Sequence, residues 1–202
     1  ICLFSSSDLL YIVPNIISEF SLSLYKDANS LAISDPIEKP IKWNFFIFKP
    51  STKLSNCLIF DEVEPNPSLE TTEKIITKFQ NYDFSHIIGI GGGSSMDVAK
   101  FCAYKMNKLK IMIPTTFGSG SEVTRISVLK VKGKKQSFHN DKIFSDIAIV
   151  DPEFIKKTPI SIIKNSAIDA CAQCTEAFDS KNSNKYTKIL CQKAFDILED
   201  SI

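Results

Sequence analysis

Three consecutive glycines, Gly91 to Gly93, lie between an apolar run and a segment typical of a helix. Ser94 follows them, and the helical segment extends from Met96 to Asn107. Glycine lets the backbone reach positive φ and lets a ligand approach without a Cβ in the way. Because the free N–H groups at a helix start attract anions, we expect this turn to hold a phosphate. The pattern therefore predicts a nucleotide-binding enzyme.

A second loop, PTTFGSGSE, offers hydroxyl groups and glycine at the end of another apolar segment. Thr115, Thr116 and Ser119 belong to it. Both loops follow predicted strands, and open α/β sheets bind ligands at the carboxyl ends of their strands. Asp97, one turn into the predicted helix, could accept a hydrogen bond from a ligand hydroxyl or amide. Alternatively, Asp97 only steadies the helix as a capping carboxylate, with Ser94 as the N-cap.

The elements that must position these residues alternate between apolar strands and helices. The predicted strands are Asn44–Phe48, Cys57–Phe60, Ile87–Ile90, Lys110–Ile113 and Ile147–Val150, with a hairpin of Arg125–Val131 and Lys135–Phe138 around Lys132-Gly133-Lys134. One predicted helix has Asn66 as its cap and Pro67 in its first turn, and carries Leu69, Thr72, Ile76 and Phe79 at helical spacing. Two more are predicted at Ala167–Phe178 and Tyr186–Leu198. This alternation predicts an α/β fold with a mostly parallel sheet.

The composition excludes several classes of protein. With 202 residues, 44% hydrophobic and 23% charged, the sequence is typical of a globular protein. A net charge of +1 gives no electrostatic basis for binding nucleic acid or a membrane surface. The lysines between 130 and 135 are therefore expected on a solvated hairpin. The apolar segment Leu9–Tyr25 is interrupted by Pro14 and Glu19, so it does not predict a membrane span.

The six cysteines are scattered, which favours reduced thiols in a cytoplasmic protein over a disulfide framework. Cys171 and Cys174 have the spacing of half a zinc site. They lie inside a helical pattern without a second pair, so helix packing is the favoured interpretation. The sequence begins at Ile1 without a methionine, and we expect a fragment of a longer protein.

The motifs GGGSSMDVAK, PTTFGSGSEVT, IVDPE and DACAQCTEAF occur in this order. With them the chain resembles the iron-containing alcohol dehydrogenase family, relatives of glycerol dehydrogenase and dehydroquinate synthase, over residues 57–185. The resemblance implies an N-terminal dinucleotide-binding domain with a parallel sheet, followed by the start of an all-helical domain. We expect an unassigned segment at 1–43, an NAD(P)-binding α/β domain at 44–155, and an incomplete helical domain at 156–202. The implied reaction moves a hydride between NAD(P) and a small aldehyde or alcohol at a divalent metal, and a homodimer is compatible with it.

The resemblance also assigns residues to the binding of NAD or NADP. These are Gly91, Gly92, Gly93, Ser94 and Asp97 on the pyrophosphate and nicotinamide side, Thr115, Thr116 and Ser119 as further contacts, and Lys135 near the cofactor ribose. It assigns no catalytic residue in this chain.

The metal site is where the chain departs from the family, whose helix reads D-A-x-x-H. Asp169 matches, and Gln173 occupies the histidine position, on the same helical face. An amide oxygen is a weak ligand for iron or zinc, although hard ions tolerate oxygen. The family's two later histidines lie beyond residue 202, and His86 and His139 match no ligand position. We therefore predict weak or no metal binding.

Finer assignments stay open at this stage. Gln173, the stretch KGKKQSFHNDKIFSD and the segment SKNSN resemble a phosphonoacetaldehyde reductase branch. Lys49 and Pro50 follow the first predicted strand, where NAD-preferring relatives have Asp, and a lysine there would suit NADP. Two other hypotheses are a non-catalytic nucleotide-binding remnant and a lyase of the dehydroquinate synthase type.

Overall fold

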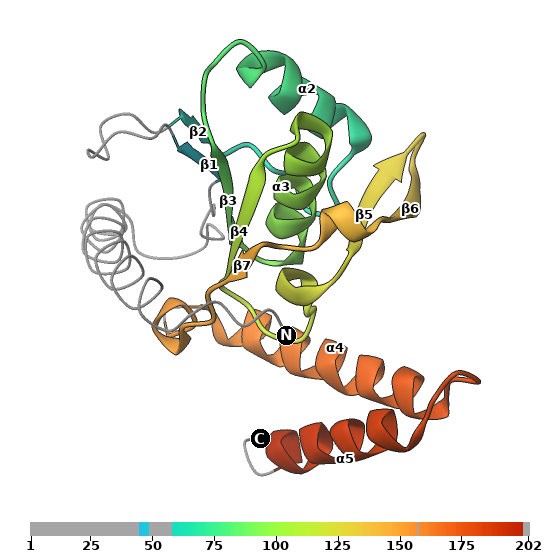
Figure 1. Ribbon diagram of the computed structural model, residues 1–202. Helices are drawn as coiled ribbons and strands as arrows, with labels where there is room; N and C mark the ends of the chain where they lie inside the picture. Colours follow the sequence, from blue (N-terminus) through green and yellow to red (C-terminus); the bar gives the residue numbers. More distant parts are fainter. Residues whose placement is uncertain (1–44, 49–57, 157, 200–202) are drawn as a thin grey trace, which may run out of the picture. The chain divides into compact units, whose positions relative to one another are not determined.

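Five strands form one sheet, in the order β2-β1-β3-β4-β7, in the computed structural model. The structure describes residues 45–48, 58–156 and 158–199, which belong to one unit of residues 41–202. The strands are β1 (Phe45–Phe48), β2 (Leu58–Phe60), β3 (His86–Gly91), β4 (Leu109–Pro114), β5 (Ile126–Val131), β6 (Lys134–His139) and β7 (Ile147–Ala148). The helices are α2 (Leu69–Phe79), α3 (Gly93–Met106), α4 (Ile160–Asp179) and α5 (Lys185–Glu199), with short 3₁₀ turns η2 (Ser121–Val123), η3 (Asp141–Ile143) and η4 (Pro152–Phe154) (Figure 1).

The strand directions confirm the α/β class. Strands β3, β4 and β7 are parallel neighbours. Strand β1 is antiparallel to both β2 and β3, so β2 runs in the same direction as β3. The expected sheet is mostly parallel, and β1 is its antiparallel strand. Residues 49–57 are too few for the crossover of about a dozen residues that a parallel connection to β2 needs.

Helix α2 is capped by Ser68 and not by Asn66. Ser68 Oγ accepts the Thr71 N–H at 3.2 Å, and the Glu64 carboxylate accepts hydrogen bonds from the side chains of Ser68 and Thr71. Asn66 has a φ of 53°, whereas an N-cap residue has an extended backbone. The expected cap at Asn66 is therefore wrong by two positions, although the helix itself is confirmed.

Helix α3 carries the glycine turn at its start. Its N-cap is Gly92, with no side-chain cap, so the expected cap at Ser94 is wrong. Asn107 ends the helix in the left-handed conformation. Helices α2 and α3 pack side by side on one face of the sheet (Figure 1). The resulting core contains Phe60, Ile75, Phe79, Phe84, Ile87, Met96, Val98, Ala99, Phe101, Cys102, Ala103, Met112 and Leu129.

The predicted hairpin is confirmed as β5 and β6, a separate two-stranded sheet. Lys132 and Gly133 both have positive φ, as a two-residue turn of type I′ requires. Both predicted C-terminal helices are confirmed, and α4 begins earlier than expected, at Ile160, directly after Pro159. Cys171 and Cys174 lie on α4, which packs against α5.

No helix in the described part of the chain has both the length and the apolar character needed to cross a membrane. The expectations for residues 1–43, including Leu9–Tyr25, and for Lys49 and Pro50 fall outside the described residues.

Candidate functional site

A cavity of about 520 Å³ lies where the predicted loops meet. It is lined by Asn66, Pro67, Gly93, Ser94, Asp97, Ser119, Ser121, Thr124, Ile126, Val128, Leu129, Lys130, Lys135, Asp169 and Gln173. The lining therefore comes from the loop before α2, the start of α3, the loop after β4, the β5–β6 hairpin and helix α4. Four of these five segments contain residues that the sequence predicted as cofactor or metal sites, namely the start of α3, the loop after β4, the hairpin and α4.

Most predicted site residues reach this cavity. Gly93, Ser94, Asp97, Ser119 and Lys135 line it. Both residues of the predicted metal pair line it as well. The remaining four, Gly91, Gly92, Thr115 and Thr116, do not line it.

Those four residues form the contact between the two loops. The Thr115 N–H donates to the Gly91 carbonyl at 3.0 Å. A Cβ on Gly92 would lie 3.3 Å from Thr116 Oγ1, so a side chain there would press on the second loop. Thr115 Oγ1 is buried and has no hydrogen-bond partner among the described residues. A buried hydroxyl without a partner is costly, and this one lies in the contact between the two loops, away from the cavity lining.

The start of α3 has the features of an anion cradle. A Cβ on Gly93 would lie 3.3 Å from Ser119 Cβ, so glycine is what lets the loops approach this closely. The first N–H groups of a helix have no acceptor within the helix. The Asn66 N–H donates to Ser94 Oγ at 3.3 Å, which brings the loop before α2 to the same place. The residues present therefore fit a pyrophosphate.

Asp97 connects this helix to the rest of the cavity wall. Its Oδ1 accepts the Ser121 hydroxyl at 2.6 Å, and its Oδ2 accepts the Val128 N–H at 3.0 Å. Burial raises the pKa of the Asp97 carboxyl, against the hydrogen bond from Ser121 and the charge of Lys100. The interpretation of Asp97 as a helix cap is wrong, because its partners lie on the loop after β4 and on β5.

Lys100 is a residue that the sequence did not single out. Its side chain is fully buried, and its Nζ lies 3.4 Å from Asp97 Oδ1. The ammonium donates to the carbonyl of Ser121 at 2.7 Å and also to the carbonyls of Thr124 and Ile126. Burial lowers the pKa of Lys100, and the Asp97 charge opposes this. The signal in the sequence that could have identified it is a lysine within the otherwise apolar run Val98–Ala103, three positions after Asp97.

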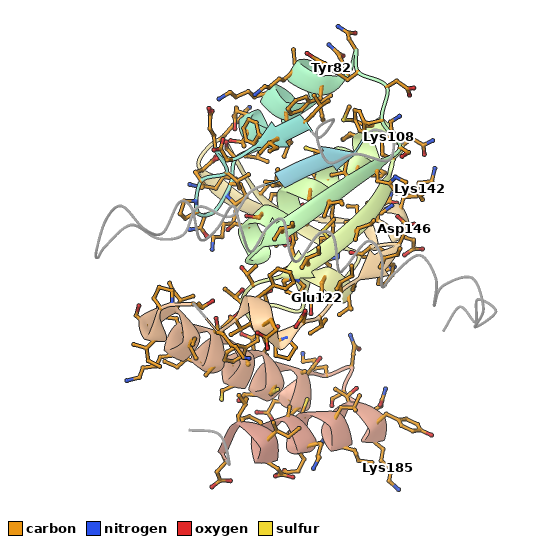
Figure 2. The ribbon with its side chains drawn as sticks, turned by 90° about the vertical axis from the view of Figure 1, so that its left-hand side faces the viewer. Tyr82, Lys108, Glu122, Lys142, Asp146 and Lys185 are labelled. Atoms are coloured by element: carbon orange, nitrogen blue, oxygen red, sulfur yellow. The ribbon has the colours of Figure 1, made fainter. Side chains whose placement is uncertain are left out.

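Helix α4 contacts the loop after β4 at Gly118. Gly118 has a φ of 96°, and a Cβ there would lie 2.5 Å from the Ser166 carbonyl oxygen. Thr158 Oγ1 also donates to the Thr115 carbonyl at 3.2 Å. Figure 2 shows Glu122, in this loop, at the opposite end of the sheet from Tyr82 and Lys108, which precede β3 and β4. The carboxyl ends of the parallel strands thus face α4.

The predicted metal pair does not have the geometry of a transition-metal site. Asp169 and Gln173 share one face of α4, as their spacing predicted, but the Gln173 amide donates to Asp169 Oδ2 at 3.0 Å. No group of three or more His, Cys, Asp or Glu side chains in the described part of the chain could hold a metal ion. One carboxylate and one amide do not fit iron or zinc, which prefer imidazole, thiolate or several carboxylates.

The two histidines lie at strand ends. His86 is the first residue of β3, where its ring nitrogen Nδ1 pairs with the Ser85 hydroxyl. His139 is the last residue of β6 and lies opposite Ile126. Neither lines the cavity.

Two further lining residues were missed because their role depends on tertiary contacts. Pro67 was interpreted only as part of a helix start. Its carbonyl accepts the Lys130 N–H at 2.7 Å, which joins the loop before α2 to β5. Lys130 was expected on a solvated hairpin, and it lines the cavity instead.

Comparison with known proteins gives a consistent result. The family described as "Iron-containing alcohol dehydrogenase" matches residues 48–152. A 4-hydroxybutyrate dehydrogenase of Clostridium kluyveri is 33% identical, and the match covers 77% of this chain and 48% of that protein.

Solved structures give the same fold. An iron-containing alcohol dehydrogenase of Thermotoga maritima has a TM-score of 0.65 at 30% identity, covering 69% of this chain and 44% of that one. A sulfoacetaldehyde reductase of Bifidobacterium kashiwanohense, solved with NAD+, has a TM-score of 0.59 at 28% identity, covering 67% and 46%. The chain spans less than half the length of each of these three relatives.

Proposed function

The chain belongs to the iron-containing alcohol dehydrogenase family, and from this we propose that it forms the dinucleotide-binding part of an oxidoreductase. The proposed reaction transfers a hydride between NAD(P)H and a small aldehyde or alcohol. The observation that carries this proposal is the cavity, in which the glycine turn, the Ser119 loop and Lys135 meet helix α4.

We propose that the start of α3, from Gly91 to Ser94, binds the cofactor pyrophosphate through backbone N–H groups. Thr115 is a further proposed contact next to this turn, since its N–H donates to the Gly91 carbonyl at 3.0 Å. Thr116, Ser119 and Lys135 complete the proposed contacts. When bound, the cofactor supplies or accepts the hydride.

The resemblance assigns Asp97 to cofactor binding, whereas its hydrogen bonds favour a role in holding the cavity wall. It lines the cavity, but each carboxylate oxygen already accepts a hydrogen bond from the protein. We therefore propose that its first task is to orient the Ser121 loop and β5, and that any contact with the nicotinamide side is additional.

The proposed function includes no metal-dependent step, because the Asp169 carboxylate accepts a hydrogen bond from the Gln173 amide. A small aldehyde is proposed as the substrate, and the phosphonoacetaldehyde branch is kept as one candidate. The domain division at residues 155–156, a homodimer and a cytoplasmic location remain predictions.

Titration with NADH and NADPH, followed by nicotinamide fluorescence, tests cofactor binding directly. A Gly93→Ala variant should weaken binding, because the added Cβ lies in the cradle, 3.3 Å from Ser119 Cβ. Thermal unfolding of the variant, followed by circular dichroism, shows whether weaker binding comes from the blocked binding site or from loss of the folded structure. Absence of binding to the folded wild-type protein would contradict the proposal.

A non-catalytic role is the second candidate, and the Gln173–Asp169 hydrogen bond favours it. Measuring nicotinamide absorbance in the presence of an aldehyde distinguishes the dehydrogenase from the non-catalytic protein. Steady oxidation of the cofactor supports the dehydrogenase, and binding without turnover supports the remnant. The lyase hypothesis would require NAD to be restored within each turnover, so no net change in absorbance would accompany product formation.

A further inference from the structure

Two lysines face each other across the β5–β6 hairpin. Lys130 and Lys135 are direct partners in the antiparallel register, and both line the cavity. Directly opposed residues in such a pair have Cβ atoms on the same face, about 4.5–5.5 Å apart. Two like charges in this arrangement destabilise the hairpin. A negative charge held between the two ammonium groups would relieve this repulsion.

The protein does not supply that charge within the described residues. The ion pairs found there join Lys74 to Glu62, Lys100 to Asp97, Lys110 to Asp146, Arg125 to Asp141 and Lys156 to Glu153. Neither Lys130 nor Lys135 belongs to any of them. Asp169 lines the same cavity, but the Gln173 amide is bonded to its carboxylate.

The hairpin is held in place, so the lysine pair is part of the cavity wall. The Lys130 N–H donates to the Pro67 carbonyl at 2.7 Å, and Ser68 and Lys130 form a β-bridge. On the other side, the Val128 N–H donates to Asp97 Oδ2. Only the flexible lysine side chains then need to be ordered by a ligand.

We propose that Lys130 and Lys135 together bind an anionic oxygen group: a phosphate, phosphonate, sulfonate or carboxylate that enters the cavity. The family resemblance assigns only Lys135, and near the cofactor ribose. In the hairpin Lys130 lies directly opposite Lys135, so the proposed site contains two lysine ammonium groups. The inference rests on the proposed function, because the anionic group is carried either by the cofactor or by the substrate.

The test compares Lys130→Met with Lys134→Met. Both variants lose one positive charge, but Lys134 is exposed, lies opposite Val131 and does not line the cavity. Dissociation constants for NADH, NADPH and inorganic pyrophosphate are measured by fluorescence and calorimetry. We expect Lys130→Met to weaken at least one anion by about tenfold, the size of one lost charge-assisted contact. Lys130→Arg keeps the charge and should retain most of the affinity.

The pattern of loss identifies the source of the anion. Weaker NADPH with unchanged NADH assigns the pair to the 2′-phosphate, and equal losses for both assign it to the pyrophosphate. If binding of both cofactors is unchanged, calorimetry compares the binding of 4-hydroxybutyrate with that of 1-propanol. Selective loss of 4-hydroxybutyrate binding assigns the pair to the substrate's acidic group. The proposal is overturned if Lys130→Met matches Lys134→Met in every measurement.

Failure of the proposed function would look different. In that case the wild-type protein binds neither dinucleotide, and pyrophosphate alone reports on the lysine pair. Pyrophosphate binding that Lys130→Met weakens and Lys134→Met does not would still support the pair as an anion site. No pyrophosphate binding to the folded wild-type protein would reject the pair as well.

Discussion

Lys100 and Asp97 lie one turn apart on α3, with Nζ 3.4 Å from Oδ1, and together they connect the glycine-turn helix to two other segments of the cavity wall. Asp97 accepts hydrogen bonds from Ser121 and Val128, while Lys100 donates to backbone carbonyls of the same loop and strand. A carboxylate alone would satisfy only donors, and an ammonium alone only acceptors. The pair thus fixes the positions of the loop after β4 and of the β5–β6 hairpin relative to the start of α3.

Replacing Lys100 with methionine should destabilise the protein strongly. The variant keeps the volume but leaves the Asp97 charge buried without its partner, and the Ser121 carbonyl without its donor. Breaking a buried pair in this way costs about 3–5 kcal/mol. Denaturant unfolding measures the loss. The control is Lys105→Met, an exposed lysine on the same helix, for which we expect a change of about 0.5 kcal/mol or less. Equal midpoints for the two variants would contradict the role assigned to Lys100.

The cap of α2 should make stability depend on acid pH through Glu64. Burial acts to raise the pKa of this carboxyl, but the hydrogen bonds from Thr71 and Ser68 outweigh burial and hold the pKa below its ordinary value. The folded state therefore prefers the ionised form, and the stabilisation is present above the unfolded pKa. It is lost as the pH falls through the lower, folded value.

Glu64→Gln provides the measurement for this pH effect. The variant should unfold more easily than wild type at pH 7, and the difference in free energy of unfolding should shrink in acid. The side chain is only partly buried, whereas that of Lys100 is fully buried, so the difference will be below that of Lys100→Met. A difference that stays constant from neutral to acid pH would rule out the lowered pKa. Glu70→Gln, in the first turn of the same helix, serves as the control for loss of charge.

Gly118→Ala should disturb the contact between the loop after β4 and α4. Alanine disfavours a φ of 96°, and its Cβ would lie 2.5 Å from the Ser166 carbonyl oxygen, so α4 has to move. Gly120 also has positive φ, but nothing lies within 4 Å of a Cβ there. Gly120→Ala therefore carries only the backbone cost of about 1 kcal/mol, and Gly118→Ala should cost more. Thermal unfolding of the two variants compares them, and a smaller loss for Gly118→Ala would argue against close packing on α4.

The elements near the site could be predicted from the sequence because their signals are local. Gly91, between an apolar strand and a helix, and Lys132-Gly133, between two strands, adopt the positive φ angles that their turns require. The two loop motifs and the family resemblance together identified seven of the fifteen residues that line the cavity.

What could not be predicted depends on partners far away in sequence. The direction of β1 is set by its pairing with β3, and the role of Lys100 by carbonyls of residues 121–126. Asn66 does not cap α2, because its backbone is left-handed and its N–H donates to Ser94 on α3. Lys130 looks like any hairpin lysine until its cross-strand partner and the Pro67 carbonyl are known.

Gln173 should decide whether α4 holds a metal. As purified, the protein should contain far less than one equivalent of iron or zinc, because Asp169 is the only charged ligand candidate on that helix face lining the cavity. Gln173→His places an imidazole four residues after Asp169, a spacing that lets both side chains grip one ion. Elemental analysis and zinc titration by calorimetry should show tighter zinc binding for the variant than for wild type. Cys171→His, which places the imidazole two residues short of that spacing, is the control. One tightly held equivalent of iron or zinc in the wild-type protein would show that the amide and carboxylate suffice, and that the metal prediction is wrong.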